Sequence, residues 1–355
     1  MDNPVKVAVV GLGRSGWDIH VQRMRTDERF RITAVADFLP ERRAEAQAEF
    51  GCAVFSDHQS LLKAADAHLV VVASYSFTHA HIATKALSSG RHVLVEKPIA
   101  MNAAQVDRMA RARDESGSKL FVFLNYRYTK DYRHLREVMA SRLIGDVFEI
   151  RIRLSNFSRR NDWQTLRAYG GGVLNNTCPH FLDIALRLLA SPVAEVFSDL
   201  KLTSDVGDVE DHVKLVLMGE NGRIVDLEVS SSCNLSEPKW TLLGTHGTLT
   251  SDGEMSQIRY FDPGKLSALS TVKGPADGRK YGNADQIPWE EKTVPSEGAV
   301  PHDLYDNLYA VLREGAEQDI LLEEAREVVR ITEAARKLDG FYGGVSRSFR
   351  PEHRG

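Results

Sequence analysis

The chain has 355 residues, and its 45 Lys and Arg against 49 Asp and Glu leave a formal net charge of −4. Apolar residues make up 43% and charged residues 26%, which is typical of a soluble globular protein of about two domains. This balance gives no strongly basic face, so we expect no nucleic-acid partner. Three widely spaced cysteines predict neither a disulfide framework nor a metal site, and they fit a reducing cytoplasm.

The chain has no basic start followed by an apolar leader, and its longest apolar runs fall well short of the roughly 20 residues that cross a bilayer. We therefore expect neither export nor a membrane partner.

Short apolar runs alternate with helical stretches in the first third of the chain. Strands are expected at residues 5–10, 32–36, 69–73, 92–95 and 121–124, with helices at 40–50 and 78–89 between some of them. Such alternation predicts a parallel sheet with right-handed crossovers. The expected fold class is α/β, with an N-terminal doubly wound Rossmann domain over residues 1–124.

After residue 125 the pattern changes to a charged helix at 131–142 and then longer alternating strands at 148–155, 193–203, 213–218 and 224–231. Consecutive strands without intervening helices predict an open, mostly antiparallel sheet. Residues 252–295 show weak periodicity and are expected to form a long loop or irregular hairpins, whereas 303–313 and 323–338 are expected to be helices. The second domain, residues 125–355, would be of α+β character.

A glycine fingerprint follows the first predicted strand and opens a helix. Its residues are Gly11, Leu12, Gly13, Arg14, Ser15 and Gly16. The first glycine permits a tight turn, the second lets backbone N–H groups approach a pyrophosphate, and the third lets the helix pack closely on the sheet. The alternative is an ordinary turn without a ligand.

Asp37 ends the second strand, where a carboxylate can accept hydrogen bonds from the adenosine ribose. It would also repel a 2′-phosphate, so NAD is expected rather than NADP. Arg42 and Arg43 argue the other way, because a basic pair one turn into the next helix could reach a phosphate. Asp37 could instead cap that helix.

Lys97 stands after the apolar run 92–95 and between Glu96 and Pro98. A lysine at the carboxyl end of a strand in an open α/β sheet lies where such folds bind ligands. A partly dry pocket can lower the pKa of its ammonium enough for acid–base work near neutral pH. The alternative is a surface ion pair between Lys97 and Glu96.

A second cluster runs from Gly170 to Asp183 and includes three consecutive glycines. The apolar spacing predicts a helix beginning near His180, on which His180 and Asp183 share a face. The imidazole could take a proton from a sugar hydroxyl while Asp183 holds its tautomer. A structural histidine paired with Asp183 is the alternative.

Polar aromatic residues mark a third group. Tyr126, Arg127 and Tyr128 lie where the chain leaves the first domain, and Trp163 comes later in the second domain. Aromatic rings with hydrogen-bonding groups suit a sugar ring at a domain cleft, although they could equally pack a hinge.

Taken in order, these pieces make the chain resemble the Gfo/Idh/MocA oxidoreductase family. The matching pieces are 8–16, 36–37, Thr78-His79, Glu96-Lys97-Pro98, Asn125-Tyr126-Arg127, 170–183 and 307–309. The resemblance implies a nicotinamide cofactor between a Rossmann domain and an open-sheet domain that is often used for oligomer contacts, here a homodimer or homotetramer.

The resemblance also implies site residues. Lys97 and His180 match the family's catalytic lysine and histidine. The cofactor would further contact Ser74, Tyr75, His79, Glu96, Lys97 and Asn125. The substrate would contact Lys97, Tyr126, Arg127, Trp163, Asn176 and His180. Many members carry Asp where this chain has Asn176, and residues 73–75 depart from the family's usual Thr-Pro pair.

The expected activity is an NAD(P)-dependent oxidoreduction of a ring hydroxyl or ketone in a sugar, an inositol-like polyol or a glycoside. Because Asn176 cannot take a proton, the acid–base work would fall on Lys97 and His180. Two alternatives stay open: a glycoside hydrolase that oxidises and re-reduces its sugar on a held NAD, and a non-catalytic NAD or sugar sensor.

Overall fold

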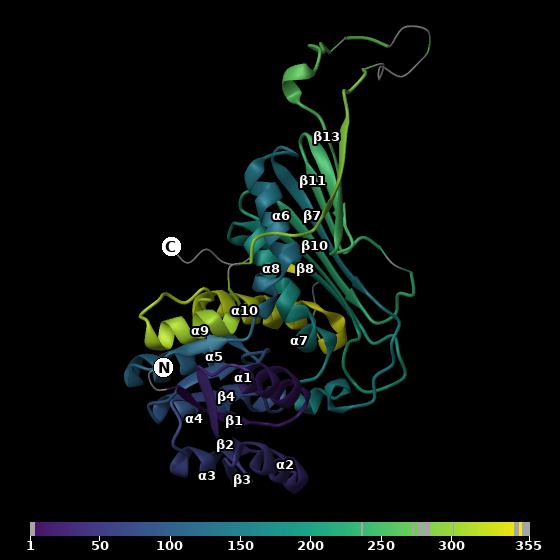
Figure 1. Cartoon of the computed structure of the whole chain (residues 1–355). Coiled ribbons are helices and arrows are strands. Elements are labelled where there is room, and N and C mark those ends of the chain that lie inside the picture. Colours follow the sequence, from purple (N-terminus) through teal and green to yellow (C-terminus); the bar gives the residue numbers. More distant parts are fainter. Residues whose placement is uncertain are drawn as a thin grey trace.

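A computed structural model describes residues 4–235, 237–271, 273–275, 279, 285–300, 302–343 and 348–349. The outer ends of the two predicted domains, residues 1–3 and 350–355, lie outside this described part, as do residues 272, 276–278 and 280–284 of the predicted loop. The two domains lie one above the other, each built on its own sheet (Figure 1).

The N-terminal sheet has six strands in the order β3-β2-β1-β4-β5-β6, all paired in parallel. The strands are β1 (Val5–Val10), β2 (Phe30–Ala36), β3 (Ala53–Phe55), β4 (Leu69–Val72), β5 (His92–Val95) and β6 (Leu120–Val122). This order confirms the predicted doubly wound fold. The chain reverses direction across the sheet between β1 and β4, and ligands bind at the carboxyl ends of strands beside such a switch.

Helices cover both faces of this sheet. After the glycine loop, a π-helical segment (Ser15–Val21) continues into α1 (Gln22–Arg25), and the crossovers that follow are α2 (Pro40–Phe50), α3 (His58–Ala64), α4 (His79–Ser88) and α5 (Ala103–Ser116). The helix predicted at residues 40–50 is confirmed to the residue. Pro40 lies in the first turn of α2, and Gly51, whose φ is +59°, ends the helix.

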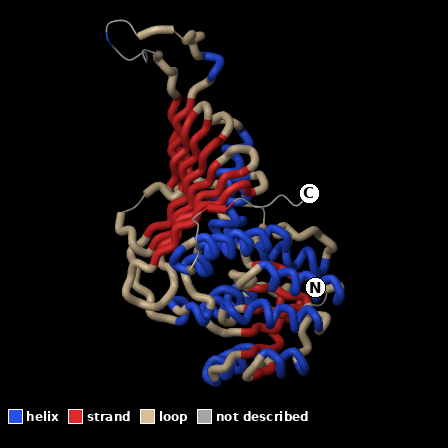
Figure 2. The backbone as a smooth tube through the Cα atoms, turned by 180° about the vertical axis from the view of Figure 1, so that it is seen from behind, coloured by secondary structure: helices blue, strands red, loops and turns tan. Residues whose placement is uncertain are grey.

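The C-terminal sheet has nine strands in the order β14-β13-β12-β11-β7-β10-β9-β8-β15. They are β7 (Val147–Ser155), β8 (Val193–Lys201), β9 (His212–Gly219), β10 (Ile224–Ser230), β11 (Trp240–Gly244), β12 (Gly247–Ser251), β13 (Met255–Tyr260), β14 (Glu290–Pro295) and β15 (Ser348–Phe349). Among the described strand pairs of this second sheet, β7–β10 alone is parallel. The mostly antiparallel sheet is confirmed, and Figure 2 shows its strands extending into an arm.

Several strands differ from the sequence prediction. The hairpin β11–β12 was not predicted, and β13 and β14 pair with each other at the two ends of the stretch expected to be a long loop or irregular hairpins. Helices α6 (Lys130–Ser141), α7 (Val173–Asn176), α8 (Cys178–Leu189), α9 (Leu304–Arg313) and α10 (Leu322–Leu338) complete the fold.

The two C-terminal helices connect the two hydrophobic cores. Leu308 on α9 is buried within the core of the N-terminal sheet. On α10, Ala325 and Val329 belong to that core, while Val328 and Ile331 belong to the core of the second sheet. A boundary at 124/125 therefore separates the two sheets, but the first core includes residues from the far end of the chain.

No helix in the described residues is long and apolar enough to cross a membrane.

Candidate cofactor and substrate site

A cleft of about 650 Å³ lies at the carboxyl ends of β1, β2, β4 and β5 and is closed on its far side by residues of the second domain. We call it the cofactor cleft. The residues predicted from the sequence that line it are Gly11, Gly13, Arg14, Ser15, Asp37, Ser74, Tyr75, His79, Glu96, Lys97, Trp163 and Asn176. Segments from both domains thus contribute to one site.

The glycine loop leaves room for a dinucleotide. A Cβ on Gly11 would lie 2.6 Å from Ala73 O, and one on Gly16 would lie 1.8 Å from Gly11 O, so both positions need the close backbone approach. A Cβ on Gly13 would meet only the Arg42 side chain, at 3.8 Å. The backbone at Gly13 is therefore open to the cleft, as a bound pyrophosphate requires.

Asp37 is fixed by the loop it faces. Its two carboxylate oxygens accept hydrogen bonds from Leu12 N at 2.7 Å and Leu39 N at 2.9 Å. Arg42 Nη1 lies 3.5 Å from the same carboxylate, whereas Arg43 donates to the backbone oxygens of Asp37 and Phe38. Of this basic pair, Arg42 faces the cleft and Arg43 does not.

Lys97 reaches across to the second domain. Its Nζ donates to Asn176 O at 2.9 Å and to Asn176 Oδ1 at 3.3 Å. Burial lowers the pKa of Lys97; Glu96 opposes this, and Arg14 and Arg160 add to it. The surface pair of Lys97 with Glu96, which was the alternative interpretation, is absent among the described contacts, because the Glu96 side chain points into the protein.

Glu96 lies in a buried chain of polar groups. Its Oε1 is 3.3 Å from His20 Nε2, and His20 Nδ1 is 3.0 Å from the Tyr305 hydroxyl. Burial alone would raise the pKa of Glu96, but His20 and Lys97 hold it at about 2. Glu96 is therefore a carboxylate, and its negative charge lies directly behind Lys97.

His180 stacks on Tyr126, with ring centroids 4.3 Å apart and planes at 10°. Its Nδ1 is buried without a hydrogen-bond partner among the residues that the structure describes. Burial, with a further contribution from Lys97, lowers the pKa of His180 to about 3. The imidazole is consequently neutral at physiological pH.

Asp183 does not hold the His180 tautomer, and this corrects the prediction. Its carboxylate accepts two hydrogen bonds from Arg127, at 2.6 and 2.5 Å, and Arg127 also donates to Glu324. An unpaired buried guanidinium costs far more than an unpaired neutral imidazole, so the carboxylate pairs with Arg127. Arg127, predicted to contact substrate, is instead a buried ionic link between η3 (Asn125–Tyr128), α8 and α10.

Six predicted site residues do not line the cleft. They are Leu12, Gly16, Asn125, Tyr126, Arg127 and His180. Leu12 contributes its backbone N–H to Asp37, Gly16 packs on Gly11, and Asn125 Oδ1 is buried without a partner in the described part of the chain.

Sequence reasoning missed other residues of the cleft. Ser56 and Asp57 follow β3, a three-residue strand too short to be recognised. Arg160, Asp162 and Gln164 lie in an irregular segment, 156–172, that has no periodic signal.

Aromatic rings join the domains at the mouth of the cleft. Tyr75 contacts Trp163 and Tyr169 of the second domain, with ring centroids 5.1 and 5.2 Å apart. It also stacks on Phe38 and Phe77 within its own domain. We call these five residues the aromatic bridge; in the structure it holds segment 156–172 against the first domain.

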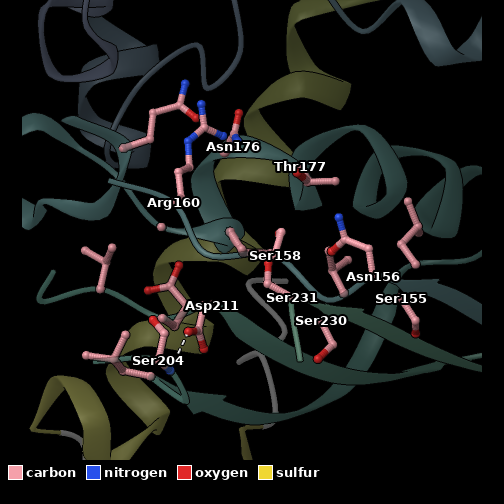
Figure 3. A pocket seen from close by; sticks show the side chains of 18 of the residues that line it. Ser155, Asn156, Ser158, Arg160, Asn176, Thr177, Ser204, Asp211, Ser230 and Ser231 are labelled. Atoms are coloured by element: carbon pink, nitrogen blue, oxygen red, sulfur yellow. Dashed lines mark hydrogen bonds between the residues drawn. The ribbon is translucent and has the colours of Figure 1, made fainter. Parts of the chain in front are cut away.

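A second cavity of about 470 Å³ adjoins the cleft, and both share the walls Arg160, Gln164 and Asn176. It extends from there to the ends of β7 and β10, and Figure 3 shows its polar side chains. We call it the sheet-end cavity.

The fold and the cleft together define an NAD-binding oxidoreductase. The sequence matches the family description "Oxidoreductase family, NAD-binding Rossmann fold" over residues 5–124 and "GFO/IDH/MocA C-terminal domain" over residues 132–250. The chain belongs to the Gfo/Idh/MocA family.

Its relatives include inositol dehydrogenases. Myo-inositol 2-dehydrogenase of Thermotoga maritima is 28% identical over 62% of this chain and 66% of that enzyme. The scyllo-inositol 2-dehydrogenase (NADP(+)) IolW of Bacillus subtilis is 24% identical over 93% of this chain and 92% of that enzyme. An NAD-binding protein from Listeria innocua has the same fold, with a TM-score of 0.83 at 23% identity over 98% of this chain and all of that one.

Proposed function

We propose that this protein is a dehydrogenase that moves a hydride between a nicotinamide cofactor and a ring carbon of a neutral sugar or polyol. The observation that carries the proposal is the place of Lys97, where the cofactor cleft meets the sheet-end cavity through Asn176. The bound cofactor would supply the redox chemistry. The protein would supply orientation and a proton acceptor.

Lys97 suits the acceptor role in its neutral form. A neutral amine has two N–H bonds, and the two oxygens of Asn176 accept both of them. The lone pair then remains for the proton of a substrate hydroxyl. Burial of Lys97 favours this neutral form. His180, which matches the family's catalytic histidine, has a pKa of about 3 and stays neutral, so it would orient a substrate hydroxyl by a hydrogen bond and leave the proton to Lys97.

We propose NAD as the preferred cofactor. Support comes from Asp37, whose carboxylate is held at the end of β2 and faces the cleft. The alternative is NADP, whose 2′-phosphate would contact Arg42 beside Asp37. The relative IolW is named for NADP(+).

The test uses the purified protein with NAD⁺ or NADP⁺ and a panel of sugars and inositols, followed by absorbance of the reduced nicotinamide. We expect NAD-linked turnover that Lys97→Ala lowers by about 10²–10⁴-fold. Full turnover of Lys97→Ala would overturn the acceptor role, and activity with NADP⁺ alone would overturn the role of Asp37. Glycoside cleavage without net NADH would favour the hydrolase alternative.

We also propose that a second copy covers the outer face of the nine-stranded sheet, where Phe148 and Met255 are 49% and 42% exposed. Light scattering of the purified protein would show a dimer or tetramer; a monomer would contradict the presence of a second copy on this face.

We also propose a cytoplasmic location, which is supported by three unpaired cysteines.

A further inference from the structure

We infer that the sheet-end cavity binds a neutral substrate of two sugar rings, with the ring to be oxidised beside Asn176 and the second ring at the ends of β7 and β10. This inference rests on the proposed function and specifies its substrate. It is argued from the size, charge and polar groups of the cavity.

The cofactor cleft and the sheet-end cavity divide the site. A dinucleotide bound in the cleft would leave the substrate the space beyond Asn176, where the sheet-end cavity begins. That space, about 470 Å³, falls among cavities that hold ligands of drug size, which are larger than a single sugar ring.

Polar groups occur at both ends of this cavity. Arg160, Gln164 and Asn176 lie at the end shared with the cleft. At the other end, Ser155 and Ser230 face each other on the parallel strands β7 and β10, with Asn156 and Ser231 following them (Figure 3). Ser158 and Thr177 also line the cavity, so a ligand longer than one ring would meet hydrogen-bonding groups along its length.

Charge argues against an anionic ligand. The cations of the wall have carboxylate partners: Arg153 pairs with Asp226, Arg160 with Asp162, and Lys239 with Asp131. A nucleotide sugar would have to place its pyrophosphate against cations that are already neutralised. A neutral ligand requires none of these pairs to break.

The wall anions are likewise occupied. Glu210 accepts a hydrogen bond from Leu174 N, and Asp211 accepts from Thr203 N and Ser204 N. Glu237 lies 4.0 Å from Arg153, and Asp252 accepts from Glu254 N. Backbone N–H groups hold these carboxylates in place but do not cancel their charge, so the wall is negative on balance, which also disfavours an anionic ligand.

Hydroxyl and amide side chains line the cavity, among them Asn156, Ser158, Asn176 and Thr177. Each of these groups can donate or accept a hydrogen bond without carrying a charge. This lining matches a polyhydroxylated, uncharged molecule.

The experiment compares single-ring probes (glucose, methyl glucoside and myo-inositol), two-ring probes (maltose, cellobiose, trehalose and sucrose) and UDP-glucose with the protein and NAD⁺. We expect at least one two-ring probe to have a kcat/KM about tenfold above every single-ring probe and UDP-glucose. A single-ring probe used equally well, or UDP-glucose used best, would overturn the inference.

A variant locates the second ring. We expect Asn156→Leu to lower the ratio of two-ring to single-ring kcat/KM about tenfold, whereas Asn234→Leu, an exposed asparagine outside the cavity, keeps the ratio. An unchanged ratio in Asn156→Leu would contradict the placement.

Failure of the proposed function would look different. If no probe reduced NAD⁺, the dehydrogenase proposal would fall, and titration calorimetry of the NAD-loaded protein with the same sugars would decide the inference by itself. Binding of a two-ring probe that Asn156→Leu weakens would support it; the absence of such binding would overturn it.

Discussion

Asn176 places a neutral amide beside the amine of Lys97, at the position where the resemblance to the family implies a carboxylate, and this amide shapes the electrostatics of the site. A carboxylate within hydrogen-bond reach would favour the ammonium form of Lys97. The amide offers hydrogen bonds without negative charge. The substitution that seemed from the sequence only to remove a proton acceptor therefore helps Lys97 to become one.

Asn176→Asp should shift the pH dependence of the reaction. The added carboxylate raises the pKa of Lys97, so the neutral amine forms at a higher pH, and the acidic limb of the kcat/KM profile for oxidation should move up by about one unit or more. Asn176→Ala is the control: it should lower the rate and leave the limb in place or move it down. An unmoved limb in Asn176→Asp would show that Lys97 is not the titrating base.

His180 links the site to the stability of the fold in acid. Its pKa is near 6.5 in the unfolded chain and about 3 in the folded protein, so below pH 6.5 the unfolded state binds more protons. Above pH 6.5 His180 does not lower the free energy of unfolding. As the pH falls from 6.5 toward 3, the free energy of unfolding decreases, by about 2 kcal/mol at pH 5.

Urea unfolding at pH 7 and pH 5 measures this effect. His180→Gln should lose about 2 kcal/mol less than the parent protein between the two pH values, since glutamine takes up no proton. Gln47→Ala, at an exposed residue that does not titrate, should lose as much as the parent. An equal loss in His180→Gln would mean that the imidazole is not held neutral.

At the scale of elements, the aromatic bridge fixes segment 156–172 over the cleft. Trp163→Ala removes its contact with Tyr75 and should speed dissociation of NADH about tenfold, because aromatic pairs contribute roughly 0.5–1.5 kcal/mol beyond their buried area. Stopped-flow displacement of NADH measures this rate. Trp289→Ala, in the protruding arm, is the matched control, and equal rates for the two variants would contradict a role for the bridge.

The elements that the sequence predicted well have local causes. The predicted bounds of β1 and β5 match the observed strands to the residue. Each strand is a short apolar run that ends at a charged or glycine-containing turn. β11 was missed: it has only five residues, and of its two partners β12 follows directly while β7 lies about ninety positions earlier in the chain. Such a strand is specified by its neighbours more than by its own sequence.

The site shows the same division between local and distant information. The glycine loop and Asp37 could be recognised because their spacing follows from one β-α-β unit. The pairing of Asp183 with Arg127 could not be recognised, because Arg127 lies 56 positions away in the sequence, whereas His180 is only three positions away. Arg160 and Gln164 lie in a segment whose position depends on packing between the two domains.

At the scale of the whole molecule, α10 lies between the two sheets and contributes to both cores (Figure 1). Leu308 on the preceding helix is fully buried in the N-terminal core. Leu308→Ala should therefore lower the free energy of unfolding by about 2–5 kcal/mol, as for a core leucine of the first domain itself.

Urea unfolding followed by circular dichroism measures this loss. Leu269→Ala, at a leucine that is 77% exposed, should change the free energy by less than about 0.5 kcal/mol. A similarly small effect of Leu308→Ala would show that α9 is dispensable for the first core.

The return of α9 to the N-terminal core has a consequence for how the chain folds during synthesis. A ribosome makes the six strands of the first sheet early, and domains generally begin to fold as they emerge. The apolar surface that Leu308 and Tyr305 will cover stays exposed until α9 has been translated. The nascent protein thus depends on this late helix, and a chain that stops before residue 304 exposes an apolar surface that quality-control factors can bind.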